Sequence, residues 1–232
     1  FEAVPKPEKI TTLNDLAPVI ELYHHMVRAG QFDAACDLYY ERLVKNIYYQ
    51  FGAYQTANEL LRSLFPDGED KLPKLEKESD QAYTLNALAN AYSLNGEPRR
   101  AVPLFEMQND LQEKAGNKSN LAIGLGNVAG QQLAIGALGE AERNLRRRID
   151  LCREIEDEGK EGTGHYELGL VLSYRGEWTE SDEELDKGET IKQKANHSAA
   201  LGIIASYRAL RSLQMYRIQR STKNIELAIQ YS

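Results

Sequence analysis

The feature that most constrains the fold is a glycine that returns every 40 residues. Three stretches, "SLNGEPRRA", "AIGALGEA" and "YRGEWTES", contain Gly96, Gly136 and Gly176, and a small residue follows each glycine five positions later. An earlier stretch, "RAGQFDAA", has the same pattern at Gly30, 66 residues before Gly96. A fixed period of this length is typical of repeat proteins, in which each unit buries its apolar surface against its neighbours. The sequence therefore predicts stacked copies of one unit.

Each copy has the pattern of two helices joined at the glycine. Ahead of Gly96, apolar residues from Leu85 to Tyr92 are spaced i, i+3, i+4, i+7, which forms one face of an α-helix. Glycine ends such a helix because it accepts the left-handed backbone conformation. The small residues let the two helices of a hairpin approach closely. The turn and packing positions predicted in this way are Gly30, Gly96, Gly136, Gly176, Ala35, Ala101 and Ala141.

This order of small residue, tyrosine, glycine, alanine and phenylalanine resembles the tetratricopeptide repeat (TPR). The copy that matches best contains Leu88, Ala89, Tyr92, Gly96, Ala101 and Phe105. The resemblance implies an all-α fold, a right-handed α-solenoid of stacked antiparallel helix hairpins. The common repeat has a period of about 34 residues. The longer unit here is similar to those in the C-terminal sensor arrays of bacterial STAND-class signalling ATPases and in motor light chains.

The rest of the chain sets the predicted boundaries. Residues 1–12 contain two prolines and no helical period, so we expect an N-terminal arm or linker there. Residues 13–232 are expected to form a single TPR-like array without strands. Its predicted hairpins span about 15–45, 80–115, 120–157, 160–195 and 198–231, with an inserted helix at about 53–65.

Composition excludes several classes of partner. The net charge of -7 gives no general attraction to nucleic acid or to anionic membranes, and no apolar run is long enough to span a bilayer. The basic cluster Arg143 to Arg148 is expected to be a solvated helix face. Two cysteines suggest a reducing, cytoplasmic location. Because the chain begins with Phe1, we expect a piece excised from a larger polypeptide.

The sequence shows no convergent set of catalytic residues, so an enzyme is not expected. His24 and His25 are adjacent and point to different helix faces, and neither cysteine has partners at zinc spacing, so no metal site is predicted. His165 occupies a packing position. The stretch "GLGNVAG" matches a glycine-rich pattern only formally, since no strand precedes it, and no cofactor is expected.

If the chain is a TPR array, the resemblance assigns the concave wall to the first helix of each hairpin. Asparagine can bind the backbone of an extended peptide, and tyrosine offers broad contact at low entropic cost. The glycines at 126 and 130 would leave the groove open, and no lysine occupies the inward positions, which argues against a clamp for a C-terminal carboxylate. The alternative is a solvated concave face that binds nothing. The predicted partner-binding residues are Tyr83, Asn86, Asn90, Ile123, Asn127, Thr163, Tyr166, Leu170 and Tyr207.

Two functions follow as expectations. The first is a non-catalytic protein- or peptide-binding module, the sensor or regulatory region of a larger STAND-type signalling protein, whose partner can be another domain of its own full-length chain. The second is a stand-alone scaffold or self-assembly module. With either function, we expect the chain to be a monomer or a weak homo-oligomer.

Overall fold

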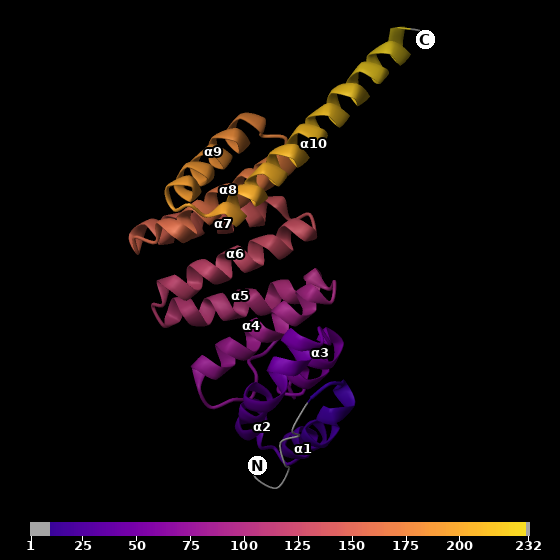
Figure 1. The fold of residues 1–232 in the computed structure, drawn as a ribbon, viewed down its shortest axis with the longest axis vertical. Coiled ribbons are helices and arrows are strands. Elements are labelled where there is room, and N and C mark those ends of the chain that lie inside the picture. Colours follow the sequence, from indigo (N-terminus) through magenta and orange to yellow (C-terminus); the bar gives the residue numbers. More distant parts are fainter. Residues whose placement is uncertain (1–9, 231–232) are drawn as a thin grey trace. The chain divides into compact units, whose positions relative to one another are not determined.

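The computed structural model of the chain describes residues 10–230, and the regular elements in that range are all helical (Figure 1). No strand occurs among these described residues. Helices that follow one another in sequence pack together in pairs, as the repeat pattern predicts. The prediction of an all-α fold built from helix hairpins is confirmed. The expected arm at 1–12 lies largely outside the described residues.

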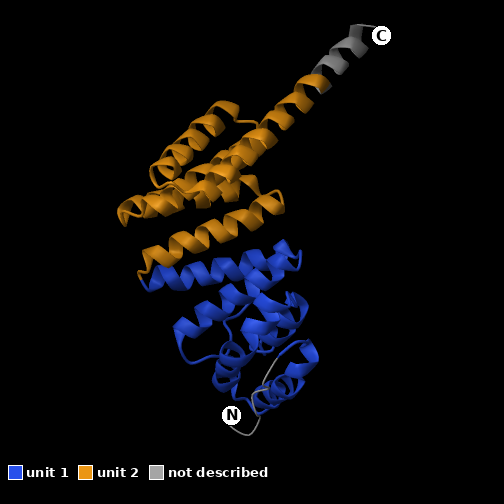
Figure 2. Cartoon of the chain, in the orientation of Figure 1, with its two compact units in different colours: residues 1–115 blue, residues 116–232 orange. Residues whose placement is uncertain are grey.

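The chain divides into two compact units, residues 1–115 and residues 116–232 (Figure 2). In the first unit, α4 and α5 form a regular hairpin, and α3 packs against α4. The elements of this unit are η1 (Leu13–Leu16), α1 (Ala17–Arg28), α2 (Phe32–Leu38), η2 (Tyr39–Leu43), η3 (Lys45–Gln50), α3 (Tyr54–Arg62), α4 (Glu78–Leu94) and α5 (Pro98–Lys114).

The second unit consists of two hairpins and one long helix. The pairs α6–α7 and α8–α9 are the hairpins, and α10 packs against both α8 and α9. Its elements are α6 (Lys118–Ala134), α7 (Leu138–Glu154), α8 (Glu158–Arg175), α9 (Trp178–Lys194) and α10 (Ser198–Gln230).

The turn glycines have the backbone conformation that the sequence pattern requires. Gly30, Gly96, Gly136 and Gly176 have φ values of 73°, 80°, 81° and 80°. In this left-handed region a side chain would be strained, so glycine ends the first helix at little cost. The chain then closes the turn with a backbone bond, as in the 2.8 Å contact from the Glu97 N–H to the Tyr92 carbonyl.

Small residues in the hairpins allow close contact between the two helices. Ala35, Ala101 and Ala141 are fully buried. In the α8–α9 hairpin, a Cβ added to Gly169 would lie 2.7 Å from Leu185 Cγ, so only glycine fits. The Ser181 hydroxyl donates to the Gly169 carbonyl at 2.6 Å, which satisfies the buried hydroxyl.

The predicted fifth hairpin, about 198–231, is wrong. Residues Ser198–Gln230 form the single helix α10 instead of two helices (Figure 1). The sequence from 203 to 230 contains neither glycine nor proline, so nothing there ends a helix. The second helix of this hairpin was expected to begin at "STKN", residues 221–224, but these residues continue α10.

The first predicted hairpin, about 15–45, also differs from the structure. Its second helix begins at Phe32 and runs on through η2 and η3 to Gln50. In this continuation the backbone winds as a π-helix, with hydrogen bonds to the fifth residue back. The Val44 N–H donates to the Tyr39 carbonyl, and the Phe51 N–H donates to the Asn46 carbonyl at 2.9 Å. Such windings are rare and occur frequently at functional sites.

Candidate functional site

A small pocket in the first unit is lined mainly by tyrosine. It encloses about 60 Å³ between the π-wound helix and α4. Three of its residues, Tyr83, Asn86 and Asn90, are predicted partner-binding residues on α4. The full lining consists of Tyr39, Tyr40, Val44, Tyr48, Tyr49, Tyr83, Asn86, Ala87 and Asn90, which we call the tyrosine pocket.

The π-winding explains why four of these tyrosines share one face. Tyr39 and Tyr48 are nine residues apart, as are Tyr40 and Tyr49. In an α-helix, residues nine apart lie on opposite faces, about 180° around the axis. In a π-helix, with roughly 4.4 residues per turn, nine residues complete about two turns. The wider winding therefore brings both tyrosine pairs to the same pocket.

The rings form two aromatic clusters on the pocket wall. The ring centroids of Tyr40 and Tyr83 are 4.5 Å apart, those of Tyr39 and Tyr40 are 5.2 Å apart, and those of Tyr48 and Tyr49 are 4.9 Å apart. Tyr39 is completely buried, whereas Tyr49 and Tyr83 are 75% and 53% exposed. The wall thus reaches from the interior of the unit to solvent, where a ligand has access to it.

Some polar atoms of the tyrosine pocket have partners, such as the Tyr40 hydroxyl, which lies 3.5 Å from the Thr84 hydroxyl, and others have none among the described residues. The Tyr39 hydroxyl is buried and makes no hydrogen bond with the described residues. Asn90 Nδ2 donates to the Asn86 backbone carbonyl at 2.8 Å, and within the described residues the side-chain oxygens of both asparagines accept no hydrogen bond. Burial raises the pKa of Tyr39 and of Tyr40 above the usual value, so both stay neutral.

The other predicted residues lie in the second unit, on the first helices of its hairpins and on α10. Ile123 is 41% exposed, Asn127, Thr163 and Leu170 are half-buried, and Tyr166 is buried. The rings of Tyr166 and of the half-buried Tyr207 lie 6.0 Å apart and join α8 to α10. Tyr166 and Tyr207 therefore contribute to the packing of α8 against α10, in addition to their predicted role in partner binding.

Gly126 and Gly130 were expected to leave the groove open, but the space at Gly126 is occupied. A Cβ on Gly126 would lie 2.0 Å from Arg148 Nη1, so the Arg148 side chain occupies that space. Arg148 extends from α7 to Glu167 on α8, where Nη1 and Oε2 are 2.5 Å apart. Arg148 is buried, so the expectation that the whole basic cluster is solvated is wrong at this residue. Gly130 remains open, with no atom within 4 Å of an added Cβ.

Lys192 is another cationic side chain that extends from the second helix of a hairpin, α9, to the first helix, α8. Lys192 of α9 is buried, and its Nζ donates to the Gly159 carbonyl at 2.6 Å and to the Thr163 hydroxyl at 2.9 Å. It also lies 6.0 Å from the centre of the Tyr166 ring. Sequence reasoning missed both cations because it assigned second helices to the outer surface. Gly126, which leaves the space that Arg148 occupies, was the available signal for Arg148, whereas the space at Gly162 is taken mainly by Ile191.

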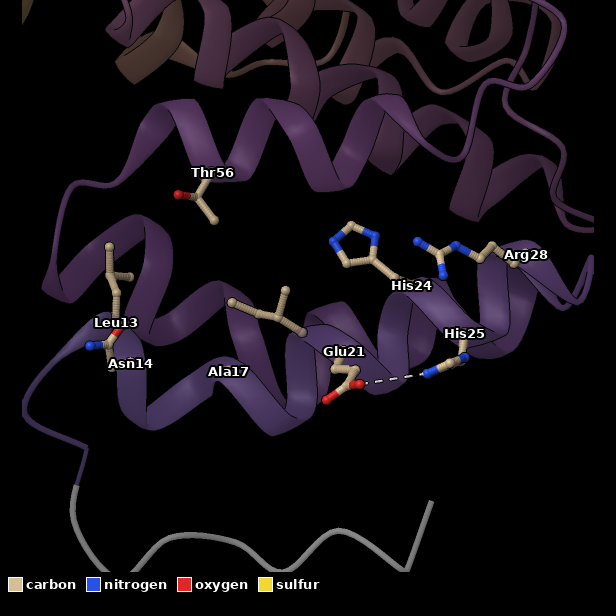
Figure 3. A pocket seen from close by; sticks show the side chains of 9 residues that line it. Leu13, Asn14, Ala17, Glu21, His24, His25, Arg28 and Thr56 are labelled. Atoms are coloured by element: carbon tan, nitrogen blue, oxygen red, sulfur yellow. Dashed lines mark ion pairs between the residues drawn. The ribbon is translucent and has the colours of Figure 1, made fainter.

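A wider cleft of about 600 Å³ lies beside α1 (Figure 3). His24 and Arg28 point toward α3 and Thr56, whereas His25 points to another side and lies 3.8 Å from Glu21. The two histidines therefore do not converge on one ligand. Within the described residues, no three His, Cys, Asp or Glu side chains come together as a metal-binding group. In that same range, no helix has the length and apolar character needed to cross a bilayer.

Comparison with known proteins finds likeness in structure only. No protein family and no curated protein matches the sequence. The "Podosopora anserina" putative kinesin light chain with nearly identical TPR-like repeats aligns over 95% of this chain and 97% of its own, with 19% identity and a TM-score of 0.53.

Two further structures were determined with a peptide or carry a described peptide site. Bacillus thuringiensis PlcR, in complex with the peptide PapR7 and DNA, aligns over 86% of this chain and 77% of its own, with 15% identity and a TM-score of 0.56. YrrB, described as a TPR protein with an unusual peptide-binding site, aligns over 80% and 90%, with 16% identity and a TM-score of 0.53. The fold of this chain is therefore that of the TPR-like repeat proteins.

Proposed function

We propose that this chain is a non-catalytic module that binds a protein segment or peptide, with the tyrosine pocket as part of its contact surface. The observation that carries the proposal is the tyrosine pocket itself. Aromatic rings that are exposed at Tyr49 and Tyr83 line the same pocket as Asn86 and Asn90, whose side-chain oxygens accept no hydrogen bond from the residues that the structure describes. An extended peptide offers both apolar side chains for such rings and backbone N–H groups for such oxygens.

The solved structures support a peptide as the partner. PlcR was crystallised with a peptide, and YrrB is described as having a peptide-binding site. These structures resemble this chain in fold. The argument that this chain also binds a peptide comes from the surface chemistry of the tyrosine pocket. In the second unit, taken by itself, we propose a further group of contact residues: Ile123, Asn127, Thr163, Leu170 and Tyr207.

We further propose that the chain is the sensor or regulatory region of a larger, cytoplasmic signalling protein of the STAND type. Two features support this assignment by resemblance: the 40-residue period, and the extra helix α3 that follows the first copy of the repeat. Reading the complete gene tests it. A nucleotide-binding motif upstream of the array would support the assignment, and a complete gene without one would contradict it.

Peptide selection tests the binding proposal directly. A display library of random 12-residue peptides is selected on the whole chain, and the dissociation constant of the best peptide is measured. The variant Tyr83→Ala/Asn90→Ala should weaken binding at least tenfold, because it removes an exposed ring and an amide while leaving the buried core intact. Tyr174→Ala, which removes an exposed tyrosine from α8, is the matched control and should bind as the wild type does.

Failure of the library to yield any binding peptide would contradict the proposed function. Equal losses in the site variant and in the control would show that the peptide binds elsewhere.

Self-assembly is a second candidate, which the exposed end of α10 favours. Leu213, Tyr216 and Ile218 are 45%, 57% and 54% exposed on that helix. Large exposed apolar side chains gathered on one element are typical of contact surfaces. Light scattering of the wild type and of Leu213→Ser/Ile218→Ser across a hundredfold range of concentration tests this candidate. A mass that stays monomeric throughout would rule it out.

A further inference from the structure

We infer that the tyrosine pocket is a subsite for the ammonium group of a lysine side chain in the bound peptide. The inference rests on the proposed function and adds the identity of the residue that the pocket selects. Three observations lead to it: the chemistry of the pocket wall, the asparagine oxygens beside it, and the charge of the unit that contains it.

The wall consists of rings that attract a cation. Tyr39, Tyr40, Tyr48, Tyr49 and Tyr83 line the pocket, and burial keeps Tyr39 and Tyr40 neutral. The faces of aromatic rings carry negative potential and bind ammonium groups, most strongly where water is excluded. Neither acidic nor basic side chains line the pocket, so nothing within the lining competes for the cation.

The side-chain oxygens of Asn86 and Asn90 favour a hydrogen-bond donor over an apolar occupant. Asn90 Nδ2 donates to the Asn86 backbone carbonyl at 2.8 Å, and neither side-chain oxygen accepts a hydrogen bond from the described residues. An ammonium group brings three donors, and these two oxygens can accept from it.

The volume of the pocket sets the size of the group. The free volume of about 60 Å³ is several times the roughly 10–15 Å³ that one water molecule needs, so the pocket holds only a small group. The compact ammonium of lysine with its last methylene suits such a space better than the broad, planar guanidinium of arginine.

The charge of the first unit complements a basic segment. Residues 1–115 hold 18 acidic and 12 basic side chains, a net charge of -6. Residues 116–232 hold 17 acidic and 16 basic side chains, a net charge of -1. Nearly all the net negative charge of the chain thus belongs to the unit that contains the tyrosine pocket, and a unit with this net charge attracts basic segments and repels acidic ones.

The test uses the 12-residue peptides selected on the whole chain. Selection should enrich lysine at one position, and replacing that lysine by norleucine, which has the same four side-chain carbons but no ammonium group, should weaken binding about tenfold. Tyr83→Leu and Tyr49→Leu should each reduce this ratio, because they remove aromatic faces at exposed positions where the fold does not depend on them. Tyr174→Leu should leave the ratio unchanged.

Peptides that bind with equal affinity to the wild type whether they carry lysine or norleucine would overturn this inference and leave the proposed function standing. A wild type that selects no peptide would overturn both.

Discussion

His165 on α8 and Glu184 on α9 are joined by a buried hydrogen bond, with Nδ1 2.5 Å from Oε2. Both side chains lie inside the second unit, and Glu184 also accepts from Lys187 Nζ at 2.6 Å. Arg153 of α7 approaches the other ring nitrogen of His165 at 3.2 Å. His165 thus connects three helices of this unit, which agrees with the packing role that its position in the repeat predicts.

The Glu184 carboxylate should stabilise the fold in a pH-dependent way. Burial alone would raise its pKa, but the hydrogen bonds from His165 and Lys187 outweigh burial and lower the pKa to about 2. A carboxyl whose pKa falls on folding contributes stability above its unfolded pKa, near 4.3, and that contribution is lost as the pH falls through the folded pKa of about 2. Glu184→Gln should therefore lower the free energy of unfolding by on the order of 2 kcal/mol at pH 7 and by much less near pH 2.

Urea unfolding between pH 2 and pH 7 measures this difference, with the exposed neighbour Glu183→Gln as the control. A difference between Glu184→Gln and the wild type that does not change with pH would contradict the assignment.

Two buried tyrosines should respond in opposite ways to loss of the hydroxyl. Tyr23 and Tyr39 are both completely buried, but the Tyr23 hydroxyl donates to the Leu60 carbonyl at 2.6 Å, whereas that of Tyr39 has no partner within the described residues. Tyr23→Phe should destabilise the fold by about 1 kcal/mol, and Tyr39→Phe should leave the stability equal or higher. Thermal unfolding of both variants decides the matter, and similar losses in both would refute the distinction.

Glycine-to-alanine substitutions should separate packing from helix propensity. At Gly169 an added Cβ would meet Leu185 Cγ at 2.7 Å and the Ser181 carbonyl oxygen at 3.0 Å, so Gly169→Ala should destabilise by about 1–3 kcal/mol. At Gly130 no atom lies within 4 Å, so Gly130→Ala should stabilise by about 0.5–1 kcal/mol through the higher helix propensity of alanine. Chemical denaturation gives both values, and effects of the same sign would count against this account.

The Arg148–Glu167 pair should show strong coupling. Arg148→Met leaves Glu167 half-buried and without its partner, which should cost about 2 kcal/mol after allowance for the partial exposure of Glu167. Adding Glu167→Met should restore much of the loss, because no uncompensated charge remains. A double-mutant cycle measures the coupling, and additive costs would show that the pair contributes nothing.

The sequence predicts the regular part of this fold well because the same physical rule operates at each turn. Gly96, Gly136 and Gly176 mark the hairpin turns, since glycine is the residue that takes a positive φ without strain. The absence of such a residue explains the length of α10, because no glycine or proline follows Gly202 before residue 231 to end the helix. The sequence-based prediction placed a break at "STKN", which on its own does not end a helix.

The candidate site was only partly predictable. Tyr83, Asn86 and Asn90 follow from the repeat register, because α4 is an ordinary α-helix. The four tyrosines of η2 and η3 do not follow, because a search at 3.6 residues per turn places Tyr39 and Tyr48 on opposite faces. A search at roughly 4.4 residues per turn would have aligned them. Arg148 and Lys192 were missed because a long side chain can cross between helices where the facing residue is glycine.

Because residues 39–50 wind as a π-helix, the tyrosine pocket depends on the number of residues between the two tyrosine pairs as well as on the tyrosines themselves. Deleting one residue between Tyr40 and Tyr48, so that this stretch could wind as an α-helix, would turn the second tyrosine pair away from the first by roughly a quarter turn. Every tyrosine would still be present. Evolution can therefore create or abolish this site by a single codon insertion or deletion, and homologues with identical tyrosines can differ in whether they possess it.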